Sequence, residues 1–233
     1  NYAVRQDYIS ETINPFRKME KEPEPEPKRK VLSIKDAKKL FFHLRHFDQS
    51  FEVCFTLACM VGLRRDEIES LHYEHGNNAW EFIDLEPCKL GYGRVHIRDN
   101  KRSKMRDPFI PPNAIAILQR HAPQKDPFGN ILREGTRLWP INYTREKKEL
   151  QKVSGVELPS NVLRHTAGTA WYNLANNDIK NFGSPMDWVG RQIGNTKAVA
   201  QEFYVSRVEW TREVEEFFQI GLDEEFYENE AVA

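Results

Sequence analysis

The 233-residue sequence has few cysteines and no long apolar run. Its three cysteines form no Cys-x-x-Cys pair and no even set, which argues against a disulfide framework or a zinc knuckle and predicts a reducing cytoplasm. No stretch approaches the roughly 18 consecutive apolar residues of a membrane span, and the first residues lack a signal-peptide pattern. We therefore expect neither secretion nor membrane insertion, and a hydrophobic content of 39% is enough for a globular core.

The sequence also lacks an excess of charge, with a formal net charge of −1, but its charges are unevenly distributed. Residues 1–27 and 209–233 hold 5 of the 34 basic and 15 of the 35 acidic residues, which leaves 29 basic and 20 acidic residues, a charge of +9, for residues 28–208. A basic middle between acidic ends favours DNA binding, because phosphate binding needs surplus Lys and Arg. On charge alone, a solvated surface explains the pattern equally well.

A linker is predicted near the start of the chain. Residues 20–27 alternate acid and proline, so they can form neither a helix nor a central strand and should be extended. The chain begins without Met, inside a polar helical pattern, which predicts a fragment of a longer protein. The main domain should begin near residue 31, and residues 220–233 form an acidic tail that is too polar to pack alone.

The main domain is predicted to be α+β: mostly α-helical with a small antiparallel β-sheet or hairpin. Ser33 has the pattern of an N-cap, and the apolar run 51–61 has the length of a helix and is closed by Gly62. Strand-like pieces separated by Gly and charged turns lie at 80–83, 94–97 and 108–110. Apolar residues at helical spacing lie at 34–44, 65–71, 114–121, 163–174, 186–193, 198–205 and 208–218.

Four separated segments carry arginine, lysine, asparagine and tyrosine in a distinctive order. Residues 62–68 read Gly-Leu-Arg-Arg-Asp-Glu-Ile, and residues 163–169 read Leu-Arg-His-Thr-Ala-Gly-Thr. The basic segment 100–106 lies between them, and Ile-Gly-Asn at 193–195 is followed, after nine residues, by Tyr204. In this order and spacing the segments resemble the tyrosine recombinases of the phage-integrase type, over residues 31–219.

The resemblance implies a set of catalytic residues. Arg64 and Arg164 match the two arginines that hold the scissile phosphate, with Glu67 in support. Tyr204 matches the nucleophile, and Lys101 matches the lysine that protonates the leaving 5′ oxygen. Two neighbours stay open as alternatives, Arg65 beside Arg64 and Lys104 on the same predicted hairpin as Lys101. The full candidate set is Arg64, Lys101, Asn161, Arg164, Asn195 and Tyr204.

Asn161 and Asn195 depart from the family pattern, which has His at the first position and His or Trp at the second. An amide can donate a hydrogen bond, but it cannot exchange a proton near neutral pH. Losing a general base typically slows a reaction by ~10²–10⁴-fold, so we expect a slowed enzyme. His165 is a poor substitute, because on a helix it points roughly 100° away from Arg164.

The resemblance also implies partners and a domain plan. The partner is double-stranded DNA, bound by a homotetramer that joins two sites in the cytoplasm of a bacterium, with no cofactor and no metal. Residues 1–30 would be the end of a preceding DNA-binding domain plus the linker, 31–219 the catalytic domain and 220–233 the tail. The predicted helix 208–218 packs either on its own domain or on a neighbouring subunit. Two other functions stay open: a DNA-binding accessory protein with impaired catalysis, and a relaxing topoisomerase.

Overall fold

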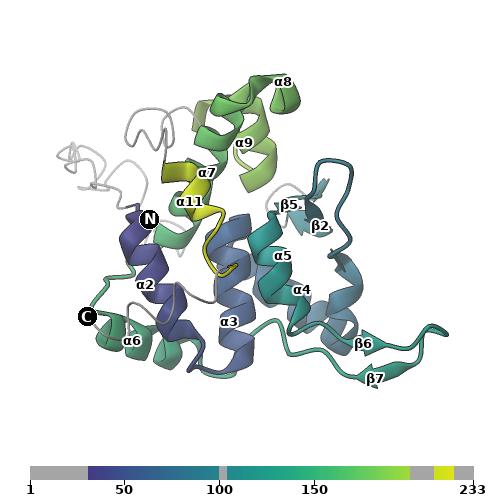
Figure 1. Ribbon diagram of the computed structural model, residues 1–233. Coiled ribbons are helices and arrows are strands. Elements are labelled where there is room, and N and C mark those ends of the chain that lie inside the picture. Colours follow the sequence, from purple (N-terminus) through teal and green to yellow (C-terminus); the bar gives the residue numbers. More distant parts are fainter. Residues whose placement is uncertain (1–30, 100–103, 200–212, 223–233) are drawn as a thin grey trace, which may run out of the picture.

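The computed structural model describes residues 31–99, 104–199 and 213–222 (Figure 1). Lys101, Tyr204, residues 1–30, residues 200–205 of the predicted helix 198–205 and most of the acidic tail lie outside these ranges. The helices are α2 (Ile34–Leu44), α3 (Gln49–Thr56), the π-helix η2 (Leu57–Val61), α4 (Arg65–His75), the 3-10 helix η3 (Gly76–Phe82), α5 (Pro112–Gln119), α6 (Tyr143–Ser154), α7 (Val162–Asn177), α8 (Ile179–Phe182), α9 (Pro185–Ile193) and α11 (Glu213–Phe217). The strands are β1 (Ile83–Asp84), β2 (Gly93–Val95), β3 (Ile97–Asp99), β4 (Lys104–Arg106), β5 (Phe109–Ile110), β6 (Gln124–Lys125) and β7 (Ile131–Arg133).

The fold is therefore mostly helical α+β with small antiparallel sheets, as predicted. β2 lies between β1 and β5 in a three-stranded sheet, and β3 pairs with β4. α8 and α9 lie at one end of the molecule and α6 at the other, while the β6–β7 hairpin extends from the side (Figure 1). None of the helices in the described part is long and apolar enough to cross a membrane.

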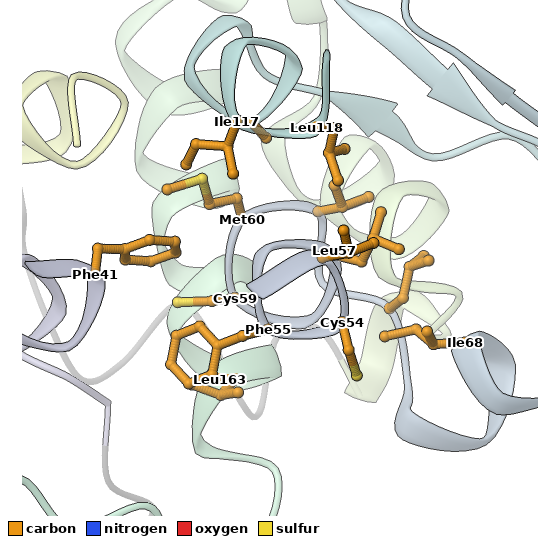
Figure 2. Close-up of a cluster of buried hydrophobic side chains, with 14 of the residues drawn as sticks. Phe41, Cys54, Phe55, Leu57, Cys59, Met60, Ile68, Ile117, Leu118 and Leu163 are labelled. Atoms are coloured by element: carbon orange, nitrogen blue, oxygen red, sulfur yellow. The ribbon is translucent and has the colours of Figure 1, made fainter. Parts of the chain in front are cut away.

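The centre of the core is the continuous helix formed by α3 and η2. Figure 2 shows apolar side chains all around it, including Phe55, Leu57 and Met60, which meet Phe41 from α2 and Ile117 from α5. A helix that is apolar on every side must be buried on every side. Helices α4, α5 and α7 therefore pack against α3–η2, and α7 also packs against α9.

The central helix ends where the first arginine segment begins. Gly62 adopts the left-handed conformation, with φ 84°. A Cβ at Gly62 would lie only 3.1 Å from Ile193 Cγ2 and 3.2 Å from Ala167 Cβ, so the close approach of α7 and α9 also requires glycine. Trp171 of α7 donates its indole N–H to the Met60 carbonyl at 2.9 Å, which fixes α7 against η2. The segment that follows Gly62 thus starts from a rigid point.

The predicted N-cap is confirmed, and several boundaries are corrected. The Ser33 hydroxyl accepts the Asp36 backbone N–H at 3.0 Å and starts α2. Residues 80–82, predicted as strand, lie in the 3-10 helix η3, and residues 94–97 divide between two strands at His96. α4 continues to His75, four residues beyond its predicted end. The sequence reading missed α6, α8 and the β6–β7 hairpin, and only α11 represents the predicted helix 208–218 in the described ranges.

Candidate active site

Arg64 stands at the N-terminus of α4, where local hydrogen bonds fix it. Its backbone N–H donates to Glu67 Oε2 at 2.7 Å, and its Nη1 donates to Glu67 Oε1 at 2.8 Å. The first bond is half of a capping box, in which the third residue of a helix satisfies the N–H of the capping residue. The spacing of Arg64 and Glu67 in the sequence therefore positions both side chains.

Arg164 reaches the same carboxylate from the first turn of α7. Its Nη1 donates to the Gly62 carbonyl at 2.6 Å and lies 3.8 Å from Glu67 Oε2, while its Nη2 donates to the Ile193 carbonyl. The two carbonyls belong to the ends of η2 and α9. Because its acceptors are backbone groups on two elements, the Arg164 guanidinium is held in one orientation, with 9% of the side chain exposed.

Asn195 connects the two arginines. It follows Gly194, which caps α9 in the left-handed conformation, and its Oδ1 accepts from Arg64 Nη2 at 3.3 Å and from Arg164 Nη2 at 3.4 Å. Arg64 Nη2 also donates to the Gly194 carbonyl at 3.1 Å. Three predicted site residues from distant segments, Arg64, Arg164 and Asn195, therefore meet in one place.

Arg106 is a further member of the cluster that sequence reasoning did not identify. Its Nη2 donates to Glu67 Oε2 at 2.6 Å, and its Nη1 donates to the Gln192 carbonyl at 2.6 Å. A Cβ at Gly194 would lie 2.9 Å from Arg106 Nε, so glycine is required beneath the guanidinium. Only the strand register indicates that Arg106 points inward. Arg106 stands opposite the buried Ile97, and opposite residues of an antiparallel pair share a face.

Glu67 is the centre of this arginine cluster, which we define as Arg64, Glu67, Arg106 and Arg164. Burial of the Glu67 carboxyl raises its pKa, but Arg106, through its charge and its hydrogen bond, together with Arg164 and the Arg64 backbone N–H, lowers the pKa below its usual range. Glu67 is therefore ionised at neutral pH. Counted over its own four residues, the cluster has three positive charges and one negative charge.

The alternative between Arg64 and Arg65 is resolved by their directions. The Arg65 guanidinium lies over the rings of Trp139, at 5.2 Å, and Tyr143, at 4.9 Å, with 58% of the side chain exposed. It forms an ion pair with Glu69, at 3.9 Å, and not with Glu67. Arg64 is the residue that enters the cluster.

Asn161 is not joined to the cluster by any hydrogen bond between described residues. It precedes α7, with φ 60° and ψ 4°, and it is the only non-glycine residue with a positive φ in the described ranges. Its side chain is exposed and caps no helix N–H, while its backbone carbonyl accepts the His165 N–H at 2.9 Å. Asparagine tolerates this left-handed conformation better than most residues do, which gives position 161 a structural role.

The described residues hold no group of three or more His, Cys, Asp or Glu side chains that could bind a metal ion. Neither the protein-family models nor the curated proteins contain a match to this chain. Among solved structures, the crystal structure of XerA recombinase is similar, with 17% sequence identity and a TM-score of 0.48. The match covers 79% of this chain and 63% of that one, so this chain spans less than two thirds of the length of XerA recombinase.

Proposed function

We propose that this chain cleaves and rejoins double-stranded DNA at specific sites, as a tyrosine recombinase of the integrase type. The observation that carries the proposal is the convergence of Arg64, Arg164 and Asn195, from three distant segments, around the buried Glu67. These residues come from the segments whose order and spacing resemble that family. Such an enzyme serves the integration, excision or movement of a mobile DNA element.

The charge of the cluster suits phosphoryl transfer better than simple phosphate binding. A phosphodiester carries one negative charge, and its five-coordinate state, formed when a nucleophile attacks, carries two. An excess of two positive charges therefore interacts more strongly with the five-coordinate state than with the bound diester, which is the requirement for catalysis. The planar guanidinium groups of Arg64 and Arg164 also match two phosphate oxygens at once.

The resemblance supplies the nucleophile and the acid. The Tyr204 phenol gives its proton to solvent, and its oxygen attacks phosphorus and forms a 3′-phosphotyrosyl bond, while the bond to the 5′ oxygen breaks and Lys101 gives that oxygen a proton. Tyrosine has a reference pKa of about 10, so the neighbouring cations assist by favouring its ionised form. Attack by a 5′-hydroxyl of another strand reverses the step and joins the DNA. The scheme requires neither a cofactor nor a metal.

The two asparagines set the expected speed of the reaction. The Oδ1 atom of Asn195 accepts from both arginines, so the amide helps to hold the two guanidinium groups together. Neither Asn161 nor Asn195 can exchange a proton, so cleavage should be ~10²–10⁴-fold slower than with a general base. We expect a homotetramer on two paired sites, in a bacterial or phage-infected cell.

A covalent trap tests the proposal. The chain is incubated with nicked suicide DNA that carries candidate sites from the ends of its own element, and the products are separated under denaturing conditions. We expect a protein–DNA adduct that is lost in Tyr204→Phe and retained in the control Tyr172→Phe, which changes a tyrosine of α7. The absence of an adduct on DNA that the protein binds would contradict the proposal.

That negative result would favour a second function, a DNA-binding accessory protein of the same fold. The observation in its favour is the pair of asparagines, above all Asn161, whose exposed side chain has no described hydrogen bond to the cluster. Such a protein would keep the arginine cluster for phosphate binding without turnover. Binding without an adduct, at every site tested, separates it from the recombinase.

A further inference from the structure

A pocket of about 370 Å³ lies between the edge of the small sheet and α9, next to the arginine cluster. Arg106 belongs both to the walls of this pocket and to the cluster, and it donates to Glu67 and to the carbonyl of Gln192, another wall residue. The pocket is lined by Arg94, Met105, Arg106, Asp107, Phe109, Trp188, Arg191 and Gln192.

Two arginines lie on a stacked aromatic pair in this pocket. The rings of Phe109 and Trp188 are stacked, with centroids 5.1 Å apart and planes inclined by 29°. The Arg94 guanidinium lies 5.1 Å from the centre of the Phe109 ring, and that of Arg191 lies 5.9 Å from the Trp188 ring. We call these four residues the arginine ledge. Contact with a ring face orients a guanidinium while its N–H groups, which lie in the guanidinium plane, can still donate to a ligand.

The ledge is fixed to the arginine cluster through Gln192. The Gln192 side chain accepts the Phe109 backbone N–H at 2.9 Å and donates to the Phe109 carbonyl at 2.8 Å. Its Nε2 also donates to the Val61 carbonyl at 3.1 Å, at the end of η2. Gln192 is buried and joins β5, α9 and η2, so the ledge and the cluster have a fixed relative position.

Within the part of the chain that the structure describes, the two arginines of the ledge form no ion pairs with carboxylates. Asp107 also lines the pocket, but its carboxylate is 2.8 Å from His96 Nδ1. Asp84 stands opposite Arg94 across β1 and β2, and its Oδ1 accepts the Glu86 N–H at 3.0 Å. Among the described residues, no carboxylate forms an ion pair with Arg94 or Arg191. Both arginines are exposed.

We propose that Arg94 and Arg191 bind backbone phosphates of the DNA strand on one side of the scissile phosphate. The inference rests on the proposed function and assigns its substrate a second contact surface. Each DNA strand carries one phosphate per 3.4 Å of helix axis, so a strand held at Arg64 and Arg164 brings further phosphates to the adjoining surface. Oriented guanidinium groups without carboxylate partners are suited to receive them.

The salt dependence of DNA binding tests this assignment. Each phosphate contact contributes about 0.9 to the slope of log affinity against log salt concentration, so Arg94→Gln with Arg191→Gln should reduce the slope by about 2. The double variant with Lys at both positions keeps the charges and should keep most of the slope. Lys152→Gln removes an exposed charge from α6, at the other end of the molecule, and should change nothing.

The outcomes separate this inference from the proposed function. A slope that falls in the Gln variant but not in the Lys variant, with unchanged thermal unfolding, supports the ledge as a phosphate site. An unchanged slope in the Gln variant, in a protein whose parent chain forms the Tyr204-dependent adduct, overturns the ledge and leaves the recombinase proposal standing. If the parent chain forms no adduct but the salt-dependence slope falls in the Gln variant, the ledge stands and the strand-transfer proposal falls.

Discussion

Two buried glutamates in this protein have opposite surroundings. Glu52, in α3, accepts from His121 Nε2 at 2.8 Å and lies 3.5 Å from Arg120, whose side chain is half exposed. Glu67, in α4, is bonded to Arg64 and Arg106 and lies 3.8 Å from Arg164. Exposed fractions of the two side chains are 12% for Glu52 and 2% for Glu67. One carboxylate has a single permanent cation beside it, and the other has three.

The difference distinguishes a structural ion pair from a candidate functional site. Buried charges are normally matched, because an unmatched charge in a low dielectric is costly. The Glu52 pair follows that rule, whereas the arginine cluster, counted over its own four residues, has two more positive charges than negative ones. Such an excess is tolerable where an anionic ligand completes the site, so we assign Glu52 to stability and Glu67 to the positioning of a phosphate-binding group.

The largest expected effect is on stability. Glu67→Gln removes the carboxylate that three guanidinium groups share, and removing one partner of a buried ionic network typically costs about 3–5 kcal/mol. Glu52→Gln should cost only about 1 kcal/mol, because Gln can still accept from His121 and Arg120 reaches solvent. Denaturant unfolding of both variants measures the difference. Equal losses would mean that the two glutamates do not differ as described.

The next largest effect sharpens the assignment of Arg64 over its neighbour. Arg64→Ala should lower the rate of adduct formation on saturating DNA by ~10²–10³-fold, as is typical for the loss of one preorganised donor to a transition state. Arg65→Ala is the matched control and should leave the rate within a few-fold, since its guanidinium lies on Trp139 and Tyr143. A larger loss of rate in Arg65→Ala than in Arg64→Ala would place the site on the other face of α4.

A gain of activity is expected at Asn195. Imidazole exchanges protons near neutral pH, so Asn195→His places a general base between the two arginines and should raise the cleavage rate by about 10²-fold. Asn161→His should raise it less, because position 161 is exposed and has no described hydrogen bond to the cluster. Asn195→Gln, which keeps the amide, serves as the control. No increase in either His variant would exclude a missing base as the cause of slow turnover.

A smaller effect is expected on the free energy of unfolding at acid pH. The pKa of Glu67 is lower in the folded protein than its ordinary value of 4.5, so the ionised carboxylate stabilises the fold above pH 4.5. That stabilisation is lost as the pH falls from 4.5 through the folded-state pKa. The difference in unfolding free energy between the parent chain and Glu67→Gln should therefore narrow in acid. A constant difference down to the lowest measurable pH would show that the charge of Glu67 is not what stabilises the cluster.

The sequence predicted those features that depend on local patterns. Ser33 as N-cap and Gly62 as the end of the central helix follow from capping chemistry and apolar spacing, and both are confirmed. The capping spacing of Arg64 and Glu67 is local as well. In contrast, Trp80–Phe82 has the residue types of a strand, but in the structure the Trp80 indole donates to the Thr136 carbonyl at 2.7 Å and the segment forms a 3-10 turn. A distant contact determined the local structure there.

Only part of the site could be predicted, because distant contacts as well as local sequence determine where its side chains lie. The resemblance identified Arg64, Arg164 and Asn195, which the fold brings together, and it placed Asn161 in the same set although its side chain is exposed. Arg106 was missed because a basic turn is normally solvated, and its inward direction depends on the register of β3 and β4. Lys101 and Tyr204 remain predictions from the sequence.

The most direct measurement of the central claim is cleavage of DNA whose scissile phosphate is replaced by a neutral methylphosphonate. If the excess charge of the cluster acts on phosphate charge, Arg164→Ala should slow cleavage of normal DNA by ~10²–10³-fold. With the neutral linkage there is one negative charge less to stabilise, so the same variant should lose less than about 10-fold. An equal loss on both substrates would contradict the claim, since Arg164 would then support the fold rather than the reacting phosphate.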